Sequence, residues 1–235
     1  MRQKSITILF GLALMLSLWL AGTPLQAHGA SARPPFGLPF ATPPGPTTWL
    51  LGGTYGNTTG AYTNRTIWYG SGQGIHFGVD FSARCGTQVV AIGDGSVLAV
   101  DYLGYGSGPH NLVILHTNGY ASLYGHLVQR SDLRAGQAVK RGDPIGLTGD
   151  PDLTCTSRPH LHLEVRDRTM GHALNAVNFI DADWDMLALT GAFGRGFQRD
   201  LDDPRKWQLM QDQPEIYWGG PLINDFAHTW PYDWK

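Results

Sequence analysis

Three short segments of the chain alternate apolar residues with histidine or acidic residues. They are residues 76–81 (HFGVDF), 120–127 (YASLYGHL) and 159–165 (PHLHLEV). Successive side chains of a β-strand point to opposite faces of its sheet, so each segment predicts a strand with one apolar and one polar face. This alternation predicts a β-sheet domain in which several polar faces carry histidine.

The alternation assigns each side chain of these segments to a face. The faces expected to pack into the core carry Phe77, Val79 and Phe81, then Ala121, Leu123, Gly125 and Leu127, then Leu161, Leu163 and Val165. The opposite faces carry His76 and Asp80, then Tyr120, Ser122, Tyr124 and His126, then His160, His162 and Glu164. Gly78 lies between His76 and Asp80 and leaves room beside them.

Composition and turn residues support a mainly β fold. Charged residues make up only 15% of the chain, and 31 residues are glycine; such chains tend to form short strands joined by tight turns. Further strands are predicted within 89–100, with a hairpin turn at 93–95, within 111–116 and 119–127 on either side of an Asn-Gly turn, and within 136–148 around a turn at 141–143. No helical segment of convincing length is evident before residue 180.

Four segments follow one another along the chain. Residues 1–32 resemble a bacterial export signal, with Arg2 and Lys4 before an apolar run and small residues at the expected cleavage site. Residues 33–46 are rich in proline and predict an extended spacer, 47–180 form the predicted domain, and 181–235 are a tryptophan-rich, irregular extension of unknown role. The chain is expected in the cell envelope or secreted, with a membrane contact only if the signal is not removed.

The cysteines and the net charge limit the compartment and the partners expected for this chain. Cys85 and Cys155 are the two cysteines, and in an oxidising compartment such a pair predicts a disulfide. The formal net charge of −2 gives no electrostatic reason to expect nucleic acid as a partner. The oligomeric state is open, with a monomer expected.

Histidine and aspartate at these spacings favour a metal site. Two histidines and one carboxylate can supply three ligands to one cation, and three protein ligands with one open position are typical of catalytic zinc. Zinc lowers the pKa of a bound water from about 15.7 to about 7. Amide hydrolysis also needs proton transfer and stabilisation of an oxyanion, which the two remaining histidines would suit.

These motifs closely resemble those of the lysostaphin/LytM-type zinc metallopeptidases. The resemblance spans about residues 55–179 and rests on the segments 76–80, 124–127 and 159–165 in that order. It implies an antiparallel β domain of the duplicated hybrid-motif type with a substrate groove, and one Zn²⁺ per chain held by His76, Asp80 and His162. It also implies that His126 and His160 are catalytic, and that the substrates are cross-link or stem peptides of peptidoglycan.

Two regions depart from the family's pattern. The loop at 155–159 lacks the family's Gly/Ser-rich turn, and because it should border the groove, substrate preference cannot be transferred. The extension after 181 has no counterpart; it would pack across the domain, cover the groove or bind wall polymer. Glu164 is either a hydrogen-bond partner of a metal ligand or a solvated strand residue, and Tyr120 and Tyr124 are candidates for substrate contact.

Other function classes fit the same residues less well. A non-catalytic wall-binding or hydrolase-activating domain of the same fold is the main alternative, but such domains have lost zinc ligands that this chain retains. An Fe(II) oxygenase uses two histidines and a carboxylate, yet an exported protein is a poor place to keep iron reduced. A lipoyl- or biotinyl-type carrier would need a lysine in the turn at 93–95, which has none.

Overall fold

The computed structural model describes residues 33–191, 197–200, 203 and 207–225, with only the backbone described for 197–199 and 207–208. The predicted export segment, together with Trp230 and Trp234, lies outside these residues. Within the described ranges, no helix is both long and apolar enough to cross a membrane. The helices there are short: α1 (Thr59–Thr63), α2 (Trp184–Thr190), and single 3-10 turns at Gly70–Gly72, Leu103–Tyr105, Ala176–Asn178 and Met210–Asp212.

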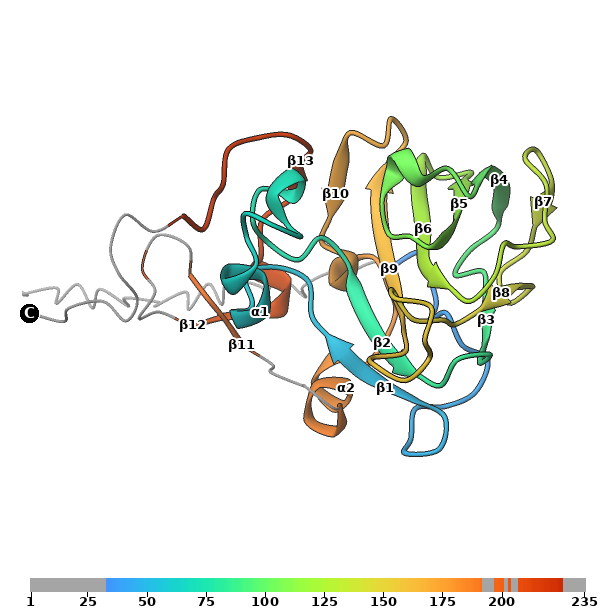
Figure 1. Ribbon diagram of the computed structural model, residues 1–235, viewed down its shortest axis with the longest axis horizontal. Coiled ribbons are helices and arrows are strands. Elements are labelled where there is room, and N and C mark those ends of the chain that lie inside the picture. Colours follow the sequence, from blue (N-terminus) through green and yellow to red (C-terminus); the bar gives the residue numbers. More distant parts are fainter. Residues whose placement is uncertain (1–32, 192–196, 201–202, 204–206, 226–235) are drawn as a thin grey trace, which may run out of the picture. The chain divides into compact units, whose positions relative to one another are not determined.

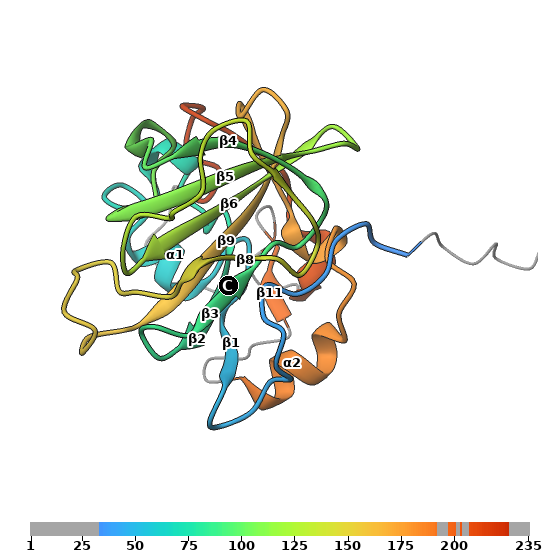
Figure 2. The same cartoon turned by 90° about the vertical axis from the view of Figure 1, so that its right-hand side faces the viewer.

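Antiparallel strands form most of the domain, as the sequence predicted (Figure 1). The main sheet has the order β1-β2-β9-β6-β5-β4-β7, and two further strands, β10 and β13, extend it beside β9. Figure 2 shows β4, β5, β6 and β9 running side by side. These strands are β1 (Trp49–Gly53), β2 (Val79–Ala83), β4 (Gly95–Val100), β5 (His110–His116), β6 (Tyr120–Leu127), β7 (Ala138–Val139), β9 (His160–Asp167), β10 (His172–Leu174) and β13 (Ile216–Tyr217).

The hairpin predicted within 89–100 does not form, whereas the two strands predicted within 136–148 do form on either side of a turn, as β7 and β8. β3 (Gln88–Val90) pairs with β8 (Pro144–Leu147), whereas β4 pairs with β5 and β7. The segment between β3 and β4 is buried and bonded to other parts of the chain: Ala91 N–H donates to Asp143, and Gly37 N–H donates to Ile92. Because these long-range bonds occupy the backbone, the turn at 93–95 joins strands of two different sheets. A further small sheet pairs β11 (Phe197–Arg199) with β12 (Trp207–Leu209).

The face assignments of β2 and β9 are confirmed. Val79, Phe81, Leu161, Leu163 and Val165 are all fully buried in the main core, and Phe77 packs against it in a half-buried position. The polar side chains of the same strands therefore lie together on the other face of the sheet.

The face assignment of β6 is wrong. Tyr124 and Ser122, expected to face outward, are fully buried, and the Tyr124 hydroxyl accepts a hydrogen bond from Ile92 N–H. Ala121 and Leu123 pack on the opposite face in a second, smaller cluster with Val113. Because apolar side chains cover both faces of this strand, alternation alone could not tell which face meets the main core, and the expected substrate contact of the tyrosines does not arise.

A bulge near the end of β6 places His126. The β5 residues His110 and Leu112 lie opposite Leu127 and Tyr124, so β6 has one more residue than β5 between these pairs. His126 has the left-handed φ of 57°, which is uncommon for a residue other than glycine. Strict alternation from Tyr124 would direct His126 into the core; the bulge turns it to the other face, while Leu127 remains buried.

The predicted spacer and extension both belong to the packed domain. Phe36 and Phe40 lie in the main core at 1% and 6% exposure, because Phe36 pairs with Ile180 through a parallel bridge and the Phe40 ring stacks on Trp49. The limits 47–180 therefore do not enclose the whole core. Near the C-terminal end, β13 pairs with β10, so this extension is not wholly irregular, and packing across the domain is the arrangement found for its described part.

Candidate metal centre

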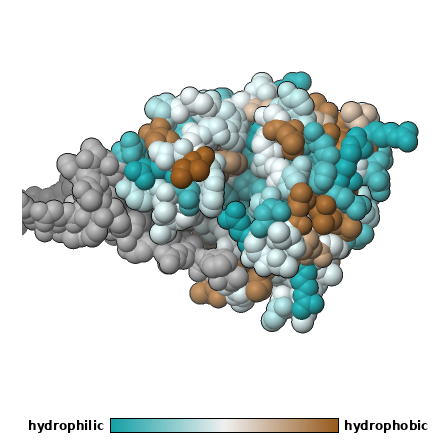
Figure 3. Space-filling model, viewed as in Figure 1, coloured by the Kyte–Doolittle hydropathy of each residue, from teal (hydrophilic) through white to brown (hydrophobic). Residues whose placement is uncertain are grey.

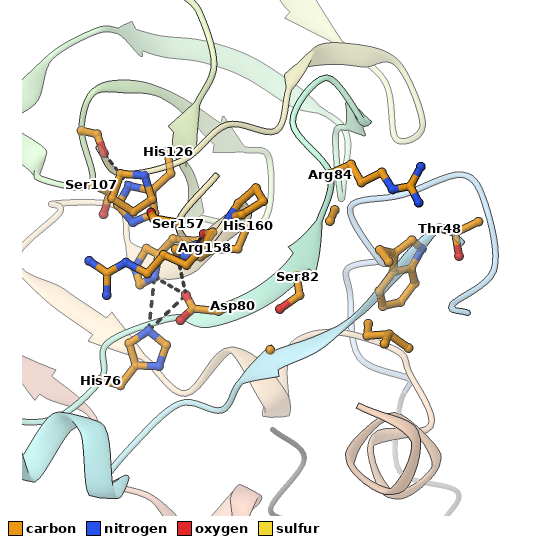
Figure 4. A pocket seen from close by; sticks show the side chains of 18 of the residues that line it. Thr48, His76, Asp80, Ser82, Arg84, Ser107, His126, Ser157, Arg158 and His160 are labelled. Carbon is orange, nitrogen blue, oxygen red and sulfur yellow. Dashed lines mark hydrogen bonds and ion pairs between the residues drawn. The ribbon is translucent and has the colours of Figure 1, made fainter. Parts of the chain in front are cut away.

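Three side chains meet at one point on the polar face of β2 and β9. The Nδ1 atom of His162 lies 2.8 Å from Oδ1 of Asp80 and 3.2 Å from Nε2 of His76. The third separation, between His76 Nε2 and Asp80 Oδ1, is 3.3 Å. Figure 4 shows His76 and Asp80 pointing toward each other across this point.

Strand register and one glycine make this meeting possible. Asp80 on β2 lies directly opposite His162 on β9, and His76 is held just before β2 by an antiparallel bridge to Gly56. A Cβ atom at Gly78 would lie 2.6 Å from Cε1 of His162. Only glycine therefore lets the His162 ring lie against β2.

The hydrogen bonds on the far side of each ring determine which nitrogen is free. His76 Nδ1 lies 2.7 Å from the Thr54 carbonyl, which can only accept, so Nδ1 carries the proton of the neutral ring. His162 Nε2 faces Oε1 of Glu164 at 3.2 Å and is protonated for the same reason. Both free nitrogens and the Asp80 carboxylate then direct lone pairs at one point.

This donor set fits a zinc ion. Three converging acceptors need a cation between them, and tetrahedral zinc with ligands at about 2.0–2.1 Å has ligand–ligand separations of roughly 3.3 Å. The separations of 2.8–3.3 Å are close to this value. The assignment of these residues as zinc ligands nevertheless stays a prediction.

The electrostatics of the site also favour positive charge. Burial raises the pKa of Asp80, but the neighbouring His76 and His162 outweigh it and hold that pKa well below its usual range. Burial lowers the pKa of His162, but hydrogen bonds and charges from Asp80 and Glu164 raise it to about 9. Both shifts have the same origin, because the cluster stabilises a positive charge placed among these three side chains.

His126 and His160 lie beside the three candidate ligands. The His126 ring is 4.8 Å from the His160 ring and 5.6 Å from the His162 ring, centroid to centroid. Nδ1 of His126 donates to the Gly108 carbonyl, and Nδ1 of His160 donates to the Arg158 carbonyl at 2.7 Å. Each neutral ring therefore keeps Nε2 as an acceptor; the catalytic role of both stays a prediction.

Burial determines the protonation state of His126. Desolvation, with smaller contributions from the charges of His162 and His160, lowers its pKa to about 3. At neutral pH the ring is therefore uncharged and can accept a proton at Nε2.

Glu164 is a buried hydrogen-bond partner rather than a solvated strand residue. It is fully buried, and besides His162 it accepts bonds from Arg166 Nε at 2.6 Å and from the Ser107 hydroxyl at 3.0 Å. Burial raises the pKa of Glu164, but Arg166 and His162 lower it to about 2, so it is ionised. Arg166 continues the alternation of β9 and was overlooked in the sequence; nothing in the sequence indicates Ser107.

We expect Glu164→Gln to weaken zinc binding by roughly 10- to 100-fold, because the amide no longer holds the proton of His162 on Nε2 as firmly. Competition with a chromogenic chelator measures this affinity. The matched control is Glu215→Gln, since Glu215 is exposed and is not one of the residues of the cluster. Because Arg166 loses a charged partner, thermal unfolding is followed in parallel. Unchanged affinity in Glu164→Gln would show that the carboxylate does not orient the ligand.

A groove of about 780 Å³ contains the cluster. Its walls include the start of β1, Trp68 and Tyr69, and the loop before β9 that the sequence placed at the groove. The predicted disulfide between Cys85 and Cys155 is confirmed, and it joins this loop to the end of β2. The disulfide holds one end of this loop beside the site, and the other end continues directly into β9.

The other described histidines make separate contacts. His110 pairs with Asp101, His116 contacts the Ser122 hydroxyl, and the His172 ring packs on Tyr217. None of the three belongs to the cluster.

Comparison with known proteins shows which proteins have a similar segment around this site. Residues 74–176 match the model of peptidase family M23. The chain is 42% identical over 89 residues to an uncharacterised metalloprotease of Haemophilus influenzae, covering 38% of this chain and 18% of that protein. It is 34% identical over 91 residues to lysostaphin of Staphylococcus staphylolyticus, covering 39% and 18%.

A third relative is the peptidoglycan DD-endopeptidase ShyA of Vibrio cholerae. The identity is 37% over 102 residues, or 43% of this chain and 22% of ShyA. The chain thus spans about a fifth of the length of these relatives. The matched segment contains all five histidine and aspartate residues of the cluster, and over this segment the chain is similar to peptidase family M23.

Proposed function

We propose that the protein is an exported zinc metalloendopeptidase that hydrolyses peptide bonds in peptidoglycan cross-links or stem peptides. One observation carries this proposal: two imidazole lone pairs and a carboxylate converge within a groove, and two further histidines lie beside them. His76, Asp80 and His162 are the proposed ligands of one zinc ion, and His126 and His160 the proposed catalytic residues.

The proposed mechanism divides the work between metal and protein. Bound zinc would supply Lewis-acid chemistry, polarising a carbonyl and acidifying a water molecule. Neutral His126 accepts a proton from the attacking water at Nε2, since its Nδ1 proton is held by the Gly108 carbonyl. Once protonated, Nε2 is a donor and can return the proton to the departing amine. His160, held by the Arg158 carbonyl, would donate to the developing oxyanion when its Nε2 is protonated.

The choice of peptidoglycan rests on the relatives. Lysostaphin and a peptidoglycan DD-endopeptidase are among them, and the family model matches the part of the chain that contains the cluster. The disulfide supports export, because such bonds persist in oxidising compartments.

Digestion of purified cell walls tests the proposal. The zinc-loaded protein is incubated with walls of several cross-link types, and released muropeptides are identified by mass spectrometry. We expect new amino and carboxyl termini, inhibition by a chelator, and recovery when zinc is restored. Wall binding without any bond cleavage in the presence of zinc would favour the non-catalytic alternative instead.

A further inference from the structure

Arg158 lies at the groove with its charge uncompensated. Its guanidinium lies over the Trp68 ring, 5.0 Å from the ring centre, and both side chains line the groove. No acidic side chain forms an ion pair with Arg158 among the residues that the structure describes. Stacking on an indole restrains a guanidinium while leaving its N–H groups free to bind an anion.

The backbone around Arg158 is held in place independently of that stacking. The buried carboxylate of Asp150 accepts hydrogen bonds from the N–H groups of Ser157 and Arg158, both at 3.1 Å. The disulfide at Cys155 anchors the same loop to β2. An arginine on a pinned loop loses less conformational freedom on binding than one on a free surface.

Few charged side chains line the groove, so an anion bound beside Arg158 would meet little repulsion from other carboxylates. Besides its histidines, the charged residues that line it are Asp80, Arg84 and Arg158, and Asp80 is engaged by His76 and His162. In Figure 4, Arg84 and Arg158 lie on opposite sides of Asp80, and Arg158 is the one on the side of His126. The apolar side chains on the face in Figure 3 form separate small groups rather than one continuous patch.

We propose that Arg158 selects peptides that carry a free carboxylate within a few residues of the cleaved bond, and that it binds this carboxylate through the guanidinium. The inference rests on the proposed peptidase function. A diaminodicarboxylic acid keeps a carboxylate on the carbon that bears the cross-linked nitrogen, whereas lysine at that place or a polyglycine bridge has none. Arg158 would therefore favour cross-links of the first kind. Since its carbonyl also accepts from His160, the residue that would position substrate is directly joined to a proposed catalytic one.

Matched synthetic peptides test this selection. Two cross-link peptides differ only in whether this carboxylate is free or amidated, and kcat/KM is measured for both with the zinc-loaded protein. A charge-assisted, bidentate contact predicts a preference of roughly 10- to 100-fold for the free carboxylate. Arg158→Gln should reduce the preference to near unity, and Arg158→Lys should keep part of it.

Two further variants separate the contact from general charge effects. Arg134→Gln removes the same charge at an exposed position outside the groove lining and should keep the full preference. Trp68→Ala should lower the preference, because Arg158 loses the ring that restrains it. Zinc content, measured by elemental analysis, should be the same in all variants, since none of the substitutions alters His76, Asp80 or His162.

Equal cleavage of the two peptides by the unaltered protein, or an undiminished preference in Arg158→Gln, would overturn this inference while leaving the peptidase function intact. If neither peptide is cleaved, the proposed function fails instead. Calorimetric binding of the same pair then decides the role of Arg158: tighter binding of the free carboxylate that Arg158→Gln abolishes would support it, and equal binding would refute it.

Discussion

His162→Ala is expected to abolish stoichiometric zinc binding and, with it, hydrolysis of peptidoglycan peptides. The substitution removes one of three converging donors, and the remaining pair, His76 and Asp80, cannot enclose the ion. The loss of affinity should exceed the roughly 10- to 100-fold expected for an outer partner such as Glu164. Zinc content after gel filtration and activity with added zinc measure the two effects.

A second histidine provides the control for this experiment. His172→Ala changes a ring that packs on Tyr217 outside the cluster and should keep one zinc per chain. Circular dichroism distinguishes metal loss from unfolding, because the core faces of β2 and β9 do not involve His162. One zinc ion retained in His162→Ala would contradict the proposed ligand set.

His126→Ala should have the opposite pattern, with zinc retained and kcat lowered by about 10²- to 10⁴-fold, the usual contribution of a general acid–base residue. His126 contributes no donor to the metal point, so affinity should stay within a few-fold of that of the unaltered protein. Stopped assays on a defined muropeptide, with zinc content measured on the same samples, give both quantities.

The pH profile provides a further check on His126. Because burial lowers its pKa to about 3, the ring stays neutral at any pH above that value, and its own protonation should not limit activity between pH 7 and 5. Activity lost between pH 7 and 5 should therefore report protons displacing zinc from its ligands, and higher zinc concentrations should shift that limb to lower pH. His110→Ala, which alters a pair with Asp101, is the control. Normal turnover in His126→Ala would exclude the base role.

The sequence identified the strands that carry the candidate site residues because its information there is local. Alternation along 159–165 identified the buried face of β9, and the same pattern placed His76 and Asp80 together. The cysteine pair also needed only their number and the compartment that the export segment indicated. For the two strands, the alternation of side chains within one segment is enough to tell which residues share a face of the sheet.

Alternation misled where the sheet is covered on both faces. In β6 the second apolar cluster around Leu123 made the two faces equivalent by composition. The left-handed φ of His126 then reversed its direction relative to the strand. Likewise, the turn at 93–95 resembled a hairpin, although its flanking strands find partners elsewhere.

The amino-acid sequence by itself determined the β class of the domain, the strands that carry the candidate ligands and the pair of cysteines that join. Tertiary structure alone decided the register that sets Asp80 opposite His162, the bulge that directs His126 to the groove, and the packing of Phe36 and Phe40 into the core. The reason is physical: strand periodicity is a property of neighbouring residues, whereas register, bulges and closure of the core depend on contacts between residues far apart along the chain.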